Sequence, residues 1–590
     1  MAFEIRVQTL IHRLEEGGWA KWIRLAVVVA FCAFVINLWL FRENGFKGLS
    51  HAHAIDQAQI SREIARGNGF STKFIRPAAL WQFTENRGAF NVERTPETFH
   101  GPLNPLINAP FLWLVRNSWP LTPKDVLYTP ERVLVAVQFA FMLAGVLMSY
   151  LTAQRLFDHR LAVLVAWLLL LCQPLWDYAI SGLPQNLLLF LFSSATYLLV
   201  RAVEARAAGT RTWPWLAGCG FAFGLLALGH ALTIWIFAGA FLFSILAFKP
   251  RWVTAVALLG SFLLLYTPWV ARTWRATGNL GGVASYTFLH QVKGTGSFVL
   301  RSMTPPLKDV SPWVYREKLQ NQIFGHLEGI YRNLGKIVVA PLFFVALLHT
   351  FKRRETALFR WAIVLMWLAA LLGMAAMGGD ETLPYSPFAP IVDSTNLHVL
   401  FVPVMTAYGL AFVLVLWSRL ELNYKLVRFG FISLIFLISS APFLVQFIEL
   451  NSRAKGRVQW PPYAPMFIAL LNQWTTEREV IASDMPWAVA WYADRKSLWL
   501  PIAIRDFEYL NDFNLLNGRI VGLYLTPVTG NKSFVSEIVK GDYKEWAPFI
   551  TRQITGSALR DFTLKASTAM PIDQECVFYA DRDRWTARDD

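Results

Sequence analysis

Long hydrophobic runs with almost no charged residues constrain this chain more than any other feature. Several runs hold about 20 residues, which as a helix is enough to cross roughly 30 Å of hydrocarbon. Only 16% of the 590 residues are charged, against about 25% in soluble domains. The chain is therefore predicted to be a polytopic α-helical membrane protein, which excludes cytosolic enzymes, fibrous proteins and disordered proteins.

The hydropathy pattern predicts about eleven transmembrane helices. They are expected at residues 25–41, 133–153, 161–174, 186–200, 214–229, 233–248, 252–271, 336–350, 361–378, 399–417 and 428–448.

Basic residues indicate how the chain is oriented. They gather in alternate connections, whereas residues 175–185, 230–232 and 379–396 contain no Lys or Arg. The positive-inside rule then places the N-terminus in the cytoplasm and the C-terminal region in the periplasm or outside, for a multi-pass protein of the cell (inner) membrane. The net charge of +15 is explained by this orientation, so we expect no nucleic-acid partner.

Two domains are predicted. Residues 1–448 form the transmembrane domain, with large outer loops at 42–132 and 272–335, and residues 449–590 form an extracytoplasmic α/β domain that is polar enough to fold alone. Within it, the patterns predict strands at 478–485, 497–501 and 519–527, and helices at 486–493 and 534–550.

The first outer loop carries the most informative group of polar residues. A helical pattern runs over residues 54–66 and ends near Gly67 and Gly69. It holds Asp56 at the membrane surface, with His53 about one turn before it. An alternative interpretation is an interfacial helix in which Asp56 offsets the helix dipole.

This segment resembles a known family. Residues 56–70 read D-x-A-x-x-x-x-x-x-A-x-G-x-G-F, which is similar to the first outer loop of GT-C glycosyltransferases, in particular the protein O-mannosyltransferase and lipid A aminoarabinose transferase group. Segments 100–106, 266–272, 396–403 and 485–501 resemble further family segments in the same order. The resemblance implies a GT-C-like transmembrane fold.

The resemblance also implies a reaction and its residues. A hexosyl- or pentosyltransferase, inverting at the anomeric carbon, would move a sugar from a polyprenyl-phosphate donor in the bilayer to a protein, glycolipid or polysaccharide acceptor. Asp56 would be the general base. Arg272, Arg275 and His398 would bind the donor phosphate, although interfacial snorkelling also explains such arginines.

Four further residues are candidates for supporting roles at this site: His53, Gln57, His100 and Lys293. No cofactor is required by the sequence, but His53 and His100 could join Asp56 around a divalent metal ion.

The chain departs from the family pattern at several charged positions. Gln57 stands where the family often has a second acid, and Gly229-His230 and His398-Val399 stand where arginines are common. Two alternatives therefore stay open, namely a noncatalytic GT-C-like scaffold subunit and a transporter of lipid-linked sugars. A transporter would favour internal repeats and ionisable residues at mid-membrane, and the sequence shows neither.

Overall fold

A computed structural model describes most of the chain. The described residues are 18–41, 46, 48–49, 51–87, 92–122, 128–292, 299–303, 310–379, 392–419, 425–452, 465–512, 516, 518–526, 544–551, 562–570 and 576–586. They divide into two compact units, one of residues 1–47 and 445–458, and one of residues 48–444 and 459–590.

The smaller unit contains helix α2 (Gly18–Phe41) and the end of α18 (Lys425–Ser452). Within this unit the rings of Phe34 and Phe447 lie 6.2 Å apart between centroids. The backbone N–H of Phe46 donates to the carbonyl of Trp39 in α2 at 2.7 Å.

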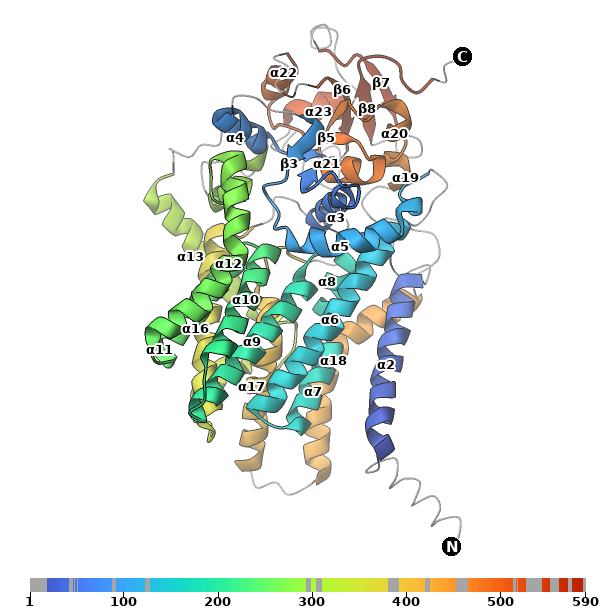
Figure 1. The fold of residues 1–590 in the computed structure, drawn as a ribbon. Helices are drawn as coiled ribbons and strands as arrows, with labels where there is room; N and C mark the ends of the chain where they lie inside the picture. The colour runs from blue at the N-terminus through green and yellow to red at the C-terminus, as the bar shows by residue number, and fades with distance from the viewer. Residues whose placement is uncertain are drawn as a thin grey trace. The chain divides into compact units, whose positions relative to one another are not determined.

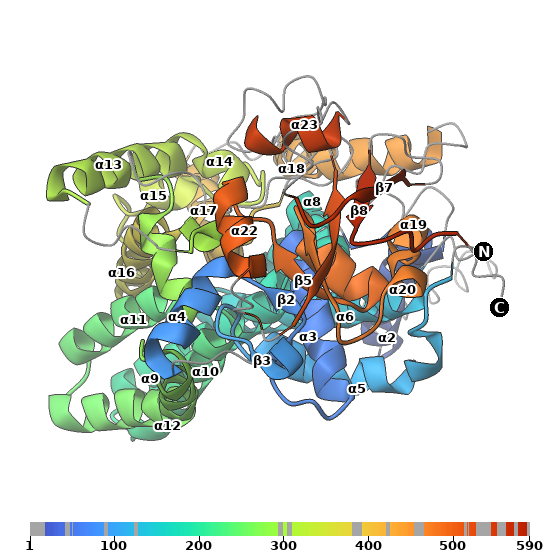
Figure 2. The ribbon, with the colours of Figure 1, turned by 90° about the horizontal axis from the view of Figure 1, so that it is seen from above.

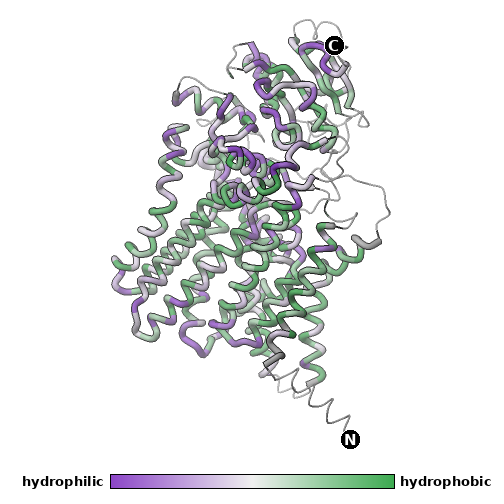
Figure 3. Tube along the Cα trace, turned by 45° about the vertical axis from the view of Figure 1, so that its right-hand side comes forward, coloured by the Kyte–Doolittle hydropathy of each residue, from purple (hydrophilic) through white to green (hydrophobic). Residues whose placement is uncertain are grey.

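The larger unit is built on apolar helices that run side by side (Figure 1). In chain order they are α6 (Thr129–Leu156), α7 (His159–Leu170), α8 (Gln173–Ser181), α9 (Gln185–Ala207), α10 (Trp213–Gly229), α11 (Thr233–Ala247), α12 (Arg251–Thr277), α15 (Leu342–Ala346), α16 (Arg354–Met377), α17 (His398–Arg419) and most of α18. Hydrophobic residues follow the length of these helices, and hydrophilic residues gather at their ends and in the segments beyond them (Figure 3).

Among the described residues, six helices are long and apolar enough to cross a membrane. The bent pair α7 and α8 raises this to seven, and three shorter apolar helices lie at Leu25–Leu40, Trp213–Gly229 and Thr233–Ala247. The expectation of a polytopic helical membrane protein is confirmed. The total of eleven spans stays a prediction.

The transmembrane helix expected at residues 336–350 is not formed. Over residues 336–350 the only helix is α15, which has five residues. Gly335 and Lys336 have φ angles of +77° and +58°, and left-handed residues cannot continue a right-handed helix. These two residues separate the run from α14. Beyond them the run forms turns and the five-residue α15, whose N-cap is Pro341, and α15 packs against α17.

Outside the bundle, the first loop forms two helices, α3 (Ala52–Ala65) and α4 (Pro77–Arg87), followed by α5 (Leu103–Leu114). Its strands β1 (Ser71–Thr72) and β3 (Thr95–Pro96) pair with each other. Strand β2 (Phe74–Ile75) instead pairs with a strand of the C-terminal region. The second loop forms the 3-10 helices η3 (Gly282–Leu289) and η4 (Val299–Arg301), then α13 (Pro312–Glu328) and α14 (Ile330–Asn333).

Within the described residues, β2 and five C-terminal strands form a six-stranded mixed sheet in the order β2-β5-β4-β6-β8-β7. The C-terminal strands are β4 (Val480–Ser483), β5 (Lys496–Trp499), β6 (Ile520–Leu525), β7 (Ala566–Ala569) and β8 (Val577–Ala580). The short helices of this region are α19 (Pro465–Ile468), α20 (Leu471–Trp474), α21 (Pro486–Ala488), the π-helix η5 (Val489–Ala493), α22 (Ile504–Asp512) and α23 (Ala547–Ile550).

The three predicted strands are confirmed as β4, β5 and β6, and the helix at 486–493 as α21 and η5. Most of the helix expected at 534–550 lies outside the described residues. The first loop supplies the edge strand of this sheet, because β2 pairs in parallel with β5, Phe74 opposite Ser497 (Figure 2). The domain boundary at 449 stays a prediction.

A cluster of charges fastens α3 to the C-terminal region. Asp494 accepts hydrogen bonds from Arg66 (Nη2, 2.6 Å) and Lys73 (Nζ, 2.7 Å), and pairs with Arg62 at 2.9 Å. Arg62 also donates to the carbonyls of Ala490 and Trp491, at the end of η5. We call Arg62, Arg66, Lys73 and Asp494 the Asp494 cluster. It fixes α3 against the segment that follows β4.

Close packing of the apolar helices provides a first prediction. A Cβ on Gly239 of α11 would lie 2.5 Å from the Leu365 carbonyl oxygen of α16, whereas one on Gly260 of α12 would meet nothing within 4 Å. We expect Gly239→Ala to lower the unfolding temperature in detergent by several degrees, since the helices must separate. The control variant Gly260→Ala should leave it unchanged. Equal unfolding temperatures for both variants would contradict this packing.

The Asp494 cluster provides a second prediction. Asn tolerates the left-handed backbone at Asp494 (φ +54°), so Asp494→Asn removes only the charge and should cost about 1–3 kcal/mol of unfolding free energy at neutral pH. Burial raises the pKa of Asp494, but Arg62, Arg66 and Lys73 outweigh burial and hold it below its ordinary value of 3.8. The difference in unfolding free energy between Asp494→Asn and wild type should therefore be largest above pH 3.8 and become smaller as the pH falls below 3.8.

Unfolding curves measured from pH 3 to pH 8 provide this test. Asp512→Asn, at an exposed position on α22, is the matched control and should have no effect. An Asp494→Asn protein as stable as wild type at pH 7 would show that the cluster does not hold α3 in place.

Candidate active site

Asp56 lies on α3 in a fully enclosed polar environment, with 1% of its surface exposed. Its Oδ1 accepts a hydrogen bond from Gln59 Nε2 at 3.0 Å. Its Oδ2 accepts one from His100 Nε2 at 2.8 Å and another from the guanidinium of Arg76. All three partners come from the first loop, so this loop alone builds the surroundings of the carboxylate.

These partners determine the protonation of the site. Burial by itself would raise the pKa of Asp56, but Arg76 and His100 hold it well below the usual range of a carboxyl group. Burial lowers the pKa of His100, although Asp56 opposes that shift. At neutral pH the site therefore contains an ionised Asp56 and a neutral His100 whose Nε2–H donates to the carboxylate.

Arg76 occupies the junction between β2 and α4. It precedes Pro77, which restricts Arg76 to an extended backbone. Its guanidinium carbon lies 4.0 Å from the ring centroid of Phe74 and 4.4 Å from that of Phe99, and the side chain is 96% buried. Its Nη1 lies 3.6 Å from Glu97 Oε2. Arg76 is thus held between two rings and two carboxylates.

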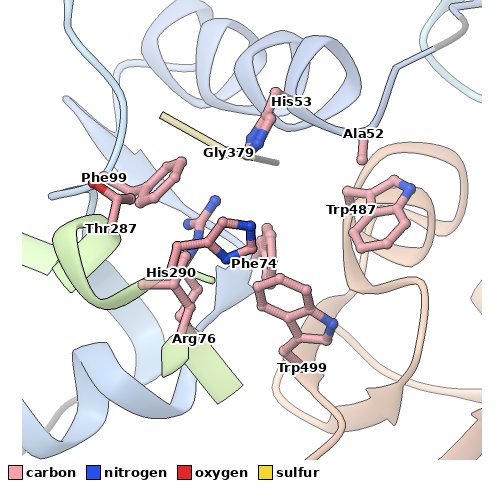
Figure 4. Close-up of a pocket in the computed structure, with 11 residues that line it drawn as sticks. Ala52, His53, Phe74, Arg76, Phe99, Thr287, His290, Gly379, Trp487 and Trp499 are labelled. Carbon is pink, nitrogen blue, oxygen red and sulfur yellow. The ribbon is translucent and has the colours of Figure 1, made fainter. Parts of the chain in front are cut away.

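A pocket opens beside Arg76, with walls from four parts of the chain (Figure 4). The first loop contributes His53, Phe74, Arg76 and Phe99, the second loop Thr287, His290 and Leu300, and the C-terminal region Trp487 and Trp499; Ala52 and Gly379 complete the lining. His53, Arg76 and His290 are turned toward one another, and the two tryptophans lie on the C-terminal side (Figure 4). The pocket combines nitrogen donors with aromatic faces.

Asp56 and His100 do not line this pocket. They lie behind Arg76 and behind His53, whose ring centroid is 5.3 Å from that of His100. His53 also stacks on His51 and Phe99, each at 5.4 Å. Arg76 therefore separates the Asp56 carboxylate from the pocket.

The structure gathers some of the predicted site residues and separates others. Asp56, His53 and His100 lie together, and Gln57 faces α5, where its Oε1 accepts from Asn104 at 2.8 Å. Arg272 is bound to the backbone, donating to the carbonyls of Glu97 at 2.6 Å and Phe70 at 2.9 Å.

Two of the remaining candidates, Arg275 and His398, lie away from the pocket, one at the surface and one in the core. Arg275 is exposed on α12, and His398 is fully buried on α17, where its Nδ1 accepts from Trp367 Nε1 at 3.1 Å. Neither these two residues nor Arg272 line the pocket. Lys293 lies outside the described residues.

A metal site was also expected as a hypothesis. Within the described part of the chain, no three His, Cys, Asp or Glu side chains are arranged to hold a metal ion. The Asp56 carboxylate, which would be a ligand of that metal ion, is paired with the guanidinium of Arg76. A divalent metal ion stays a hypothesis.

The sequence interpretation missed Arg76, His290 and Trp499 as lining residues. Arg76 carried one usable signal, since an arginine directly before a proline in the same loop as Asp56 is held extended. His290 and Trp499 carried none, because only the folding of the second loop and the C-terminal region onto the first loop brings them there.

Comparison with known proteins is consistent with this architecture. Residues 125–273 match the family described as dolichyl-phosphate-mannose-protein mannosyltransferase. No curated protein matches the chain by sequence.

Solved structures share the fold at low sequence identity. The oligosaccharyltransferase AglB from Archaeoglobus fulgidus, in complex with an inhibitory peptide and a dolichol-phosphate, has a TM-score of 0.53 and 14% identity, over 90% of this chain and 73% of that one. ArnT from Cupriavidus metallidurans, bound to undecaprenyl phosphate, has a TM-score of 0.51 and 13% identity, over 95% and 98% of the two chains. AglB has also been solved in complex with Zn and sulfate.

The family match covers residues 125–273 of the 590-residue chain, and the solved structures share its fold. Both findings support the resemblance to GT-C glycosyltransferases that the sequence indicates.

Proposed function

We propose that the protein transfers a sugar from a polyprenyl-phosphate donor to an acceptor on the outer face of the membrane. The observation that carries this proposal is the pocket that places Arg76, His53 and two tryptophans directly in front of the buried Asp56. Structures of the same fold contain dolichol-phosphate and undecaprenyl phosphate, which supports a lipid-phosphate ligand.

The pocket offers a partner for each part of such a donor. Arg76, with His53 and His290 beside it, suits a phosphate, because a guanidinium can bind two phosphate oxygens at once. Trp487 and Trp499 present large aromatic faces against which a sugar ring can pack. We therefore assign the phosphate to Arg76, with His53 and His290 beside it, and the sugar to the tryptophans.

Asp56 is the proposed general base. As the acceptor hydroxyl attacks the anomeric carbon, its proton passes to the Asp56 carboxylate, and a new bond forms between the acceptor oxygen and that carbon. The bond between the anomeric carbon and the phosphate oxygen breaks, and its electron pair leaves with the lipid phosphate. Arg76 stabilises the charge that the phosphate gains.

Several finer assignments belong to the same proposal. The reaction is inverting, with a hexose or pentose as the sugar and a protein, glycolipid or polysaccharide as the acceptor. The protein lies in the inner membrane, with a cytoplasmic N-terminus and a C-terminal α/β domain in the periplasm. The phosphate roles of Arg272, Arg275 and His398 stay predictions, and the pocket favours Arg76 over all three.

The proposal predicts that Asp56→Asn lowers sugar transfer by about 100-fold or more, because the carboxylate is removed without a change of shape. The assay uses membranes containing the protein, a radiolabelled sugar on undecaprenyl phosphate, and the endogenous acceptors. Glu63→Gln on the same helix is the matched control, and its transfer should stay near wild type. Its carboxylate is equally enclosed but contacts Arg66 and Asn68 instead of Arg76.

Two outcomes would contradict the proposal. Full transfer by Asp56→Asn would remove Asp56 as the base. A wild-type protein inactive with a panel of neutral, acidic and amino sugars would favour the noncatalytic scaffold.

A further inference from the structure

Arg76 belongs to two environments at once. It lines the pocket, and it is also the cation that neutralises the buried Asp56. A single guanidinium between a carboxylate and an open pocket can hold an incoming anion only by weakening its existing contact. The arrangement is therefore sensitive to what enters the pocket.

A second carboxylate beside Arg76 makes an exchange of partners feasible. Glu97 has 1% of its surface exposed, and its Oε2 lies 3.6 Å from Arg76 Nη1, beyond hydrogen-bond distance. Its Oε1 accepts from the backbone N–H groups of Phe99 and His100. Backbone hydrogen bonds thus hold Glu97 in place. Arg76 Nη1 can stay close to Glu97 while Nη2 leaves Asp56 and binds a new partner.

A phosphate is a suitable competitor for this guanidinium. The phosphodiester of the sugar donor carries one negative charge, as a carboxylate does, and its two non-bridging oxygens can accept two parallel N–H bonds from arginine. The guanidinium carbon lies over the rings of Phe74 and Phe99, which limit its displacement. A small rotation of the guanidinium is therefore enough to exchange Asp56 for a phosphate as its partner. His100 and Gln59 would remain on Asp56 and keep it solvated by hydrogen bonds.

We propose that Arg76 is shared between Asp56 and the phosphate of the lipid donor, so that donor binding withdraws Arg76 from Asp56 and frees this carboxylate to accept the proton of the acceptor. This inference rests on the proposed function. Before the donor binds, Arg76 neutralises the Asp56 carboxylate, which therefore cannot act as a base. Activation of the base is thus linked to donor binding through the Arg76 side chain.

Competition for Arg76 has a measurable consequence that a purely structural ion pair lacks. If Asp56 and the phosphate compete for one guanidinium, removal of the Asp56 charge must tighten phosphate binding. The effect must also disappear when Arg76 is absent. A double-mutant cycle measures this coupling directly.

The experiment is calorimetric titration of undecaprenyl phosphate into the full-length protein in detergent, for wild type, Asp56→Asn, Arg76→Gln and the double variant. We expect Asp56→Asn to bind about fivefold or more tightly than wild type and Arg76→Gln to bind at least tenfold more weakly. In the Arg76→Gln background, Asp56→Asn should have no further effect. Asp56→Ala replaces Asp56→Asn if the latter does not elute as a folded monodisperse protein.

Glu63→Gln controls for the loss of one buried negative charge from α3 and should bind like wild type. Unchanged or weaker binding by Asp56→Asn would overturn the inference, as would equal tightening with and without Arg76, since a general field effect would then explain it. The proposed function fails separately if the wild-type protein does not bind undecaprenyl phosphate, and the inference falls with it.

Discussion

The buried ion pair between Asp56 and Arg76 is the interaction on which the candidate site depends. Two opposite charges removed from water require close contact and further hydrogen bonds to be tolerated, and the first loop supplies both. Gln59 and His100 complete the shell of Asp56, while Phe74, Phe99 and Glu97 surround Arg76. The short β-strands, the start of α4 at Pro77 and the segment that carries Glu97, Phe99 and His100 bring these groups together.

The C-terminal region contributes to this site in two ways. Its Asp494 cluster fastens the C-terminal turn of α3, and its tryptophans form one wall of the pocket. The edge strand β2, which immediately precedes Arg76, belongs to the C-terminal sheet. The position of Arg76 relative to Asp56 is therefore determined jointly by the first loop and by residues more than 400 positions later in the chain.

The sequence predicted the parts of this protein that depend on local pattern. Uncharged runs predicted the apolar helices, short apolar segments predicted β4, β5 and β6, and the spacing around Asp56 placed it on a helix. The span at 336–350 was wrong because hydropathy does not register backbone conformation, and this apolar run forms turns and only the five-residue α15. The phosphate role that the resemblance implies for Arg272 stays a prediction, and the hydrogen bonds of this side chain to the carbonyls of Glu97 and Phe70 are contacts that the sequence did not predict. The pocket itself depends on contacts between distant segments, which a single sequence does not contain.

The central claim is that the phosphate of a polyprenyl donor binds at Arg76, in front of Asp56. The most direct measurement is an electron cryomicroscopy structure of the full chain with undecaprenyl phosphate. The account predicts phosphate density within hydrogen-bond distance of the Arg76 guanidinium, with Trp487 and Trp499 facing the space where the sugar would lie. Phosphate density at Arg275 or His398, with the Arg76–Asp56 pair and the pocket unchanged, would contradict it.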